Sequence, residues 1–439
     1  MSQTLTYRKI FFFWLPLAST WLMMAFEGPY LSAIIARMAE PKYNLAAYGV
    51  AFSFALIFES PVIMMMSAST ALVKDSLSFL KLRKFNFLLG GSLTLLLALF
   101  LQPDIFYFFS MDLVNLPENV AKLTHNAVIL LLPWPGSIAY RRFYQGILIN
   151  NKQTIKVALG TGVRVIAMSS TGILLYSFTE LDGASVGAAA LSAGVTSEAI
   201  ITKFMVRSVI NNLMNKRQTG SPLSFAYISK YYYPLALTSL LSLGVQPLVT
   251  FFIGSSRMAI ESLAVLPVIT SLIFIFRSVG LSYQEVGIAL IGENKSGYKK
   301  LRNFAVMLAS VLIFISSLIG FTPLSALWFE KISGLSKELS GFSLVPYRII
   351  AVMPALTVFI SFQRAMVMIS KKTSSITGAT ISEVSGIVII MLIMLNVFDS
   401  VGAVAATTAF IIGRLSANTY LMKPYRQAVK NFDRAAILK

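Results

Sequence analysis

The stretch Ile57-Phe58-Glu59-Ser60 recurs 218 positions later as Ile275-Phe276-Arg277-Ser278, with an arginine in place of the glutamate. Both copies lie in the middle of long apolar segments. An isolated charge at the centre of a bilayer costs roughly 2.5–3.5 kcal/mol on insertion scales, so such residues usually face a partner, a cavity or a substrate path. Glu59 and Arg277 are therefore the first candidates for a functional site, and their spacing suggests an internal repeat.

The composition is that of an integral membrane protein. Of the 439 residues, 56% are hydrophobic and only 13% are charged, with a mean hydropathy of +0.73. The net charge of +19 does not indicate a nucleic-acid partner, because a DNA or RNA binder gathers its basic residues into a patch. Here they lie in short turns between apolar runs. The chain has no cysteine, which excludes disulfides and thiolate metal sites.

Twelve segments are long and apolar enough to span a membrane, since a spanning helix needs about 20 mostly apolar residues. We therefore predict an all-α polytopic membrane protein with 12 transmembrane helices. The predicted spans are 10–36, 46–72, 86–109, 121–149, 156–178, 183–207, 228–254, 260–291, 303–328, 342–369, 375–397 and 400–422.

The basic residues predict the orientation of these spans. With the N-terminus inside, the inner loops and tails hold 24 of the 37 Lys and Arg residues, the outer loops hold six, and seven remain within the spans. Cytoplasmic loops carry this kind of excess. We therefore expect an integral protein of the plasma or inner membrane with both termini in the cytoplasm.

The two halves of the chain share further landmarks. Pro16-Leu17-Ala18 matches Pro234-Leu235-Ala236 at an offset of 218, and Pro135 matches Pro354 at 219. Six spans separate the copies, so both run the same way through the membrane. We predict an N-lobe (residues 1–215) and a C-lobe (216–439) with a short basic cytoplasmic tail, related by a pseudo-two-fold axis along the membrane normal.

Subtracting the charges assigned to the loops and tails leaves twelve charged residues within the spans, and arginine is in excess. They are Glu27, Glu59, Glu198, Glu285, Glu383, Arg141, Arg142, Arg164, Arg277, Arg348, Arg364 and Arg414. The repeat superposes opposite charges at three sites: Glu59 on Arg277, Arg164 on Glu383, and Glu198 on Arg414.

These charged residues are expected to have different surroundings, according to where they lie in the spans. Arg141, Arg142 and Arg364 lie near cytoplasmic ends, where we expect them to snorkel to the interface. Glu198 and Arg414 are expected to be tied down within their own lobes, because buried charges commonly pair. The excess of arginine favours an anionic solute, since a guanidinium forms bidentate hydrogen bonds with carboxylate or phosphate.

Other chemistries find little support. The sequence contains no phosphate-binding loop, and no nucleophile is placed beside a base, so we predict that the protein is not an enzyme and that a gradient drives transport. The single histidine, His125, and the 19 methionines do not form a metal-binding pattern. We expect no cofactor other than a coupling ion, H⁺ or Na⁺, and no metal site.

Several motifs point to a family. The Pro-Leu pairs that open each half and the turn with Gly146, Lys152 and Thr154 after the fourth span resemble the MATE-like branch of the multidrug/oligosaccharidyl-lipid/polysaccharide (MOP) flippase superfamily. Within it, Val345-Pro346-Tyr347-Arg348-Ile349 and Ala47-Tyr48-Gly49-Val50 are similar to the progressive ankylosis protein family. That resemblance implies export of pyrophosphate, ATP or citrate.

We therefore predict a secondary active transporter that works by alternating access and exports an organic or phosphorylated anion, acting as a monomer in contact with membrane lipid. The primary site candidates are Glu59, Arg277, Glu27 and Arg348, and the secondary ones are Arg164, Glu383, Glu198, Arg414 and Glu285. One alternative is a cation-coupled MATE multidrug exporter that uses Glu27 and Glu59. Others are a flippase for lipid-linked saccharides and a membrane scaffold whose partner surface is the tail 423–439.

Overall fold

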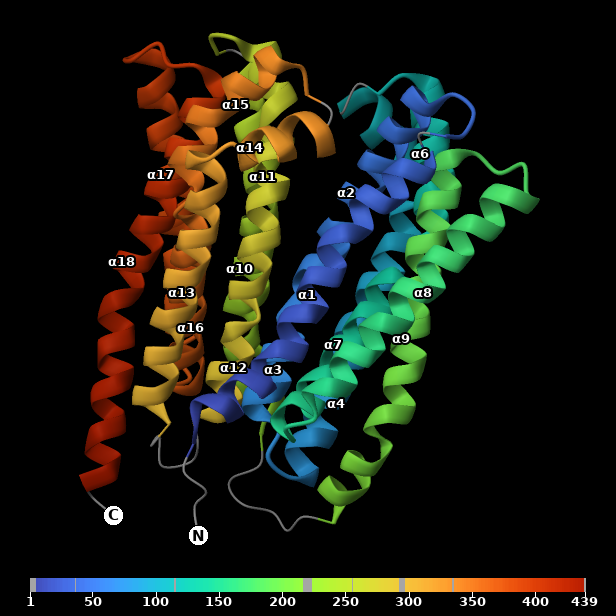
Figure 1. Cartoon of the computed structure of the whole chain (residues 1–439). Helices are drawn as coiled ribbons and strands as arrows, with labels where there is room; N and C mark the ends of the chain where they lie inside the picture. Colours follow the sequence, from blue (N-terminus) through green and yellow to red (C-terminus); the bar gives the residue numbers. More distant parts are fainter. Residues whose placement is uncertain are drawn as a thin grey trace. The chain divides into compact units, whose positions relative to one another are not determined.

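The computed structural model describes residues 5–437 except 36, 114–115, 216–222, 255, 292–296 and 334 (Figure 1). In the first half of the chain the helices are α1 (Tyr7–Ile35), α2 (Pro41–Ile63), α3 (Met65–Leu72), α4 (Ser76–Phe100), α5 (Pro103–Tyr107), the π-helix η1 (Phe108–Leu113), α6 (Glu118–Leu130), α7 (Trp134–Asn150), α8 (Thr154–Phe178) and α9 (Gly183–Met214). In the second half they are α10 (Phe225–Gly254), α11 (Ala259–Leu281), α12 (Tyr283–Leu290), α13 (Tyr298–Phe321), α14 (Leu324–Ala326), the π-helix η2 (Leu327–Ile332), α15 (Lys337–Ile350), α16 (Met353–Ile369), α17 (Ser374–Asn396) and α18 (Gly402–Ile437).

The second half repeats the element order of the first. The long α1 corresponds to α10, the broken pair α2 and α3 to α11 and α12, and each half has a short helix followed by a π-helix before its last four helices. The spans around Glu59 and Arg277 are thus the same element of each half. The order of helices agrees with the repeat predicted from the sequence.

Nine helical spans, counted over the described residues, are long and apolar enough to cross a membrane. They correspond to nine of the twelve predicted segments. The other three segments are also helical: 121–149 is divided between α6 and α7, 228–254 lies in α10, and the last segment lies in α18 from Gly402 onwards. A count of continuous apolar helices is therefore lower than the count of predicted segments.

Prolines place the same break in the fourth span of each half. Helix α7 has Pro135 at its second position, and α16 has Pro354 at the same place. Proline lacks an N–H group and disfavours the helical conformation in the residue before it, so a helix tends to restart there. The repeat therefore preserves a structural break as well as a sequence motif.

By packing, the described chain forms two compact units. The N-unit is Leu22–Ser239, and the C-unit is Leu240–Lys439 together with Met1–Trp21. Within the C-unit, Trp14 of α1 donates a hydrogen bond through Nε1 to the carbonyl of Val279, at 3.3 Å. The predicted lobe boundary at 215 and 216 falls where the described residues stop, because 216–222 lie outside them.

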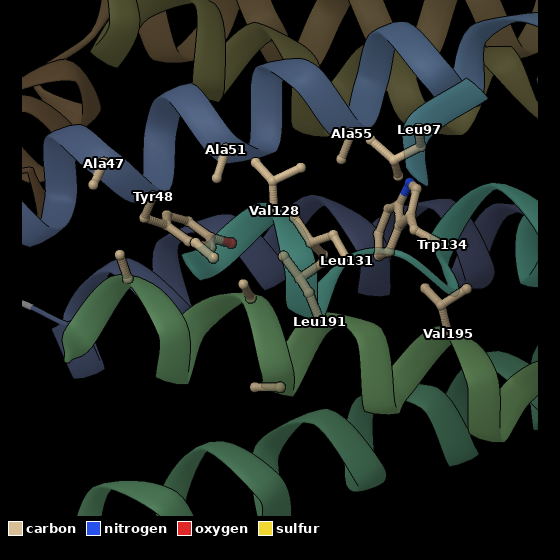
Figure 2. Packing of buried hydrophobic residues seen from close by; sticks show 14 of the residues in the cluster. Ala47, Tyr48, Ala51, Ala55, Leu97, Val128, Leu131, Trp134, Leu191 and Val195 are labelled. Carbon is tan, nitrogen blue, oxygen red and sulfur yellow. The ribbon is translucent and has the colours of Figure 1, made fainter. Parts of the chain in front are cut away.

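The core of the N-unit is built around small residues of α2. Ala47, Ala51 and Ala55 are fully buried and follow one another at four-residue intervals on one face of the helix (Figure 2). Residues of α9, including Leu191, pack with them. Small side chains let helices approach closely, which stabilises helix pairs in membranes through van der Waals contact. The same core contains Trp134, which belongs to the candidate site.

Gly146 of α7 allows the close crossing of α3. A Cβ at this position would collide with the Ser69 hydroxyl and the Met66 carbonyl oxygen, which is backbone. We expect Gly146→Ala to destabilise the protein by about 1–3 kcal/mol or more, because overpacking forces backbone shifts. Gly91→Ala in α4 is the control, since a Cβ there meets nothing within 4 Å. Thermal melting in detergent checks this, and equal melting temperatures for both variants would contradict it.

Candidate functional site

A fully buried carboxylate, that of Glu198 on α9, is the centre of a charge cluster in the N-unit. It accepts hydrogen bonds from Arg141 Nη1 at 2.7 Å, Gln145 Nε2 at 2.9 Å and Thr161 Oγ1 at 2.9 Å. Arg164 Nη1 lies 3.8 Å away from the same carboxylate. Arg141 and Gln145 are four residues apart on α7, and Thr161 and Arg164 are three apart on α8, so each helix presents two donors on one face.

The cluster continues from Arg164 to two further acids. Arg164 Nη2 forms an ion pair with Glu27 Oε2 of α1 at 2.5 Å, and its Nη1 lies 3.7 Å from the Met24 sulfur. Its guanidinium lies 5.8 Å from the centre of the Trp134 ring, within cation–π range. The Trp134 indole in turn donates through Nε1 to Glu59 Oε2 at 3.0 Å. Glu27, Glu59 and Glu198 thus belong to one network inside the N-unit.

The prediction that Arg141 and Arg142 snorkel to the interface is wrong. Arg141 is 1% exposed and Arg142 is 5% exposed. Arg141 is paired with Glu198, and Arg142 Nη1 lies 3.7 Å from the sulfur of Met66 on α3. The prediction rested on how few residues separate Arg141 and Arg142 from the cytoplasmic end of the span. That spacing does not show that α3 and α9 cover this part of α7. If Arg142, whose charge acts on the neighbouring Arg141, is counted, the N-unit cluster holds three arginines and three glutamates and is formally neutral.

The C-unit holds a second cluster in which arginine predominates. Arg414 Nη2 of α18 pairs with Glu383 Oε1 of α17 at 2.8 Å. Arg364 of α16 donates through Nη2 to Thr380 Oγ1 at 3.3 Å and interacts electrostatically with both members of that pair. Arg277 of α11 interacts with the same two residues. Glu198 and Arg414 are therefore each paired within their own unit, as predicted.

Arg277 differs from the other two arginines of this cluster. It is only partly buried, and among the described residues it has neither a hydrogen-bond partner nor an ion-pair partner at contact distance. A guanidinium that faces acyl chains is costly, so its accessible side is expected to face a polar path.

Glu59 and Arg277 lie in different units, Glu59 in the N-unit and Arg277 in the C-unit. Glu59 already has a partner in Trp134.

The other two candidates are held by their own surroundings. Arg348 of α15 donates through Nε to the carbonyl of Gly320 at 2.8 Å, and its guanidinium lies 5.1 Å from the centre of the Phe321 ring. Glu285 of α12 is buried, and Gln284 donates a long hydrogen bond to it at 3.5 Å. Within the described residues, no hydrogen bond or ion pair joins Arg348 or Glu285 to the Arg277 cluster.

A fourth pair of equivalent positions in the repeat also differs in charge, beside the three pairs with opposite charges. Gln145, which binds Glu198, matches Arg364 at an offset of 219. Trp134, Gln145 and Thr161 were not predicted as site residues. A signal was present for two of them, because Gln145 lies four residues after Arg141 and Thr161 three residues before Arg164. No such spacing pointed to Trp134.

No group of three or more His, Cys, Asp or Glu side chains suited to a metal ion occurs among the described residues. Among the described residues, the charged groups of both clusters other than Arg277 contact one another or neutral side chains.

Comparisons with known proteins identify the fold. No protein-family model and no curated protein sequence matches the chain. Among solved structures, an outward-facing multidrug resistance MATE family transporter of the MOP superfamily matches with a TM-score of 0.73 and 17% identity, over 97% of this chain and 96% of the other. A eukaryotic MATE transporter matches with a TM-score of 0.73 and 13% identity, over 97% and 98%. A MATE transporter of Vibrio cholerae in the bent form matches with a TM-score of 0.68 and 12% identity, over 97% of each chain.

The chain is therefore an integral membrane protein with the MATE fold, and the predicted MATE-like all-α architecture is confirmed. The similarity to the progressive ankylosis family stays a prediction.

Proposed function

We propose that this protein is a secondary active transporter that works by alternating access and exports an organic or phosphorylated anion, of the pyrophosphate, citrate or nucleotide type. The observation that carries this proposal is the guanidinium of Arg277, which has no acid at contact distance among the described residues. An anionic solute would compensate this charge during its passage. The fold shared with MATE transporters supports a transporter of small molecules.

In this proposal the N-unit cluster has the coupling role. Glu27 has one carboxylate oxygen paired with Arg164, and its other oxygen, Oε1, is buried without a hydrogen-bond partner among the described residues. A carboxylate in this position can exchange a proton or accept a cation without breaking the Glu198 network. H⁺ or Na⁺ is the proposed coupling ion, and the transporter is proposed to act as a monomer with both termini in the cytoplasm.

The same oxygen of Glu27 favours a second candidate function, a cation-coupled multidrug exporter. In that case the cargo would be a lipophilic cation that acids and aromatic rings bind. Glu59 and Trp134 would then be part of the binding surface, since their side chains are in direct contact.

A transport panel separates the two functions. Purified protein is reconstituted into proteoliposomes, and uptake of radiolabelled phosphate, pyrophosphate and citrate is measured beside ethidium efflux. We expect saturable, gradient-dependent movement of at least one anion and none of ethidium. Ethidium movement without anion movement would contradict the proposal and support the multidrug exporter.

A growth assay tests the second candidate directly. If the protein exports anions, cells that overexpress it should gain no resistance to ethidium, and Glu59→Gln should not change that. Protection by the wild type that is lost in Glu27→Gln or Glu59→Gln would identify those acids as coupling residues of a multidrug exporter. Glu338→Gln, a change at an exposed acid of α15, controls for expression.

A further inference from the structure

The C-unit cluster has a charge that a single monovalent anion cannot balance. Its members are Arg277, Arg364, Arg414 and Glu383, from α11, α16, α18 and α17, so their formal sum is +2. Arg348 and Glu285, two further charges in this unit's spans, cancel each other and leave the excess of the cluster unchanged. Arginines without matching acids are costly to bury, so an anion bound here would relieve the charge that Glu383 does not neutralise.

The donor groups of the cluster are only partly used. Arg364 reaches only the neutral hydroxyl of Thr380, and the Nε atoms of Arg277, Arg364 and Arg414 are buried without hydrogen-bond partners among the described residues. The guanidinium fork presents paired N–H groups that match the oxygens of phosphate or carboxylate. Three arginines around one carboxylate therefore leave donors for a second set of acidic oxygens.

The N-unit provides an internal comparison for this cluster. At the equivalent four positions it has Glu59, Gln145, Arg164 and Glu198, and the position of Arg364 is filled by the neutral Gln145. There Glu198 is satisfied by donors of its own unit. At these four equivalent positions the formal charges sum to −1 in the N-unit and to +2 in the C-unit, so only the C-unit set carries an excess of positive charge.

We propose that Arg277, Arg364 and Arg414 form a binding site for a compact dianion, either a phosphoryl group or a dicarboxylate, and that Glu383 is the internal acid which the dianion displaces from Arg414. This rests on the proposed function and names its substrate class. Arg364 sets the preference for two charges over one. Glu383 holds Arg414 in place when no anion is bound. When the ion pair between Glu383 and Arg414 forms again, it competes with the anion and promotes its release.

Binding to purified protein tests the site without relying on transport. A ligand that binds only the folded protein raises its melting temperature. Sodium pyrophosphate and sodium succinate are expected to raise the melting temperature of the wild type in detergent, whereas sodium gluconate at matched ionic strength is not. In Arg364→Gln, which installs the N-unit residue, half-saturation by pyrophosphate or by succinate should need about tenfold more ligand or worse, the loss expected for one charge-assisted contact.

Two variants control for a merely structural effect. Arg364→Lys keeps the charge and should retain most of the preference for dianions. Arg302→Gln alters an exposed arginine of α13 in the same unit and should behave like the wild type.

The role of Glu383 predicts opposite changes in binding and in turnover. In Glu383→Gln the anion no longer competes with a carboxylate, so the anion concentration that gives half-saturation should fall several-fold. The maximal rate of pyrophosphate transport should fall as well. A purely structural role would lower the rate without tightening binding.

The outcomes separate this inference from the function on which it rests. The dianion site would be overturned if gluconate and pyrophosphate reached half-saturation at the same concentration and if Arg364→Gln did not change the ratio of these two concentrations. Anion transport would still stand in that case. If no anion is bound or moved and ethidium is exported, both the site and the proposed function fail. If pyrophosphate binds and succinate does not, the ligand is a phosphoryl group, and the reverse result identifies a dicarboxylate.

Discussion

Glu198→Ala is expected to destabilise the protein by about 3–5 kcal/mol, because removing one partner of a buried ion pair leaves an uncompensated buried charge. Glu198 is fully buried and accepts hydrogen bonds from Arg141, Gln145 and Thr161, and it lies 3.8 Å from Arg164. Without it, Arg141 keeps a buried charge and no acid at contact distance among the described residues. A loss of this size is a large fraction of the roughly 5–15 kcal/mol that stabilises a typical protein, so most of the variant should fail to fold.

Thermal melting and monodisperse yield in detergent measure this effect. Glu118→Gln is the matched control, since Glu118 pairs with Lys122 at 2.6 Å on the surface of α6, where both side chains are at least 60% exposed. Surface pairs contribute little, so the control should melt like the wild type. The double variant Arg141→Met with Glu198→Leu should recover stability, because it removes both charges and keeps apolar volume. A Glu198→Ala protein that melts with the wild type would contradict the central role of this carboxylate.

Arg277→Ala is expected to abolish anion transport and to leave the fold intact. Two charge-assisted hydrogen bonds to an anion are worth roughly 3 kcal/mol, about a hundredfold in affinity. The protein loses no direct hydrogen bond or ion pair formed among the described residues when this side chain is removed. Removing a charge that lacks an acidic partner should keep or raise the melting temperature, in contrast to Glu198→Ala.

Uptake of labelled pyrophosphate and citrate into proteoliposomes, together with thermal melting, checks the second expectation. Arg257→Ala is the matched control, because Arg257 is 60% exposed and lies 3.8 Å from Asp399. Arg277→Lys should retain part of the uptake, since the ammonium keeps the charge but loses the fork. Wild-type uptake in Arg277→Ala would exclude Arg277 from the solute path, and a lower melting temperature would assign it a structural role instead.

Much of the architecture could be predicted from particular residues. The Pro135 and Pro354 pair predicted that the fourth span of each half is equivalent, and the structure places a helix break at both. The pairing of Arg414 within its own unit was also predicted, because buried charges commonly pair. These signals are readable because proline and charge act locally, whatever packs around them.

The partners of the buried charges could not be predicted in the same way. Arg141 was expected at the interface, but α9 covers it and supplies Glu198. Helices in a membrane are apolar on nearly every face, so periodicity does not say which side of α7 or α8 meets a neighbour. Trp134 links Glu59 to Arg164 because α2, α7 and α8 pack together, and this packing could not be predicted from the sequence.

The class of fold, the repeat and the set of charged residues within the spans can be predicted from the amino-acid sequence, because the bilayer demands long apolar helices and makes each interior charge conspicuous. Which of these charges neutralise one another depends on the tertiary structure. It balances Glu198 within the N-unit and leaves positive charge beside Glu383 in the C-unit, because charge pairing depends on which helix faces meet.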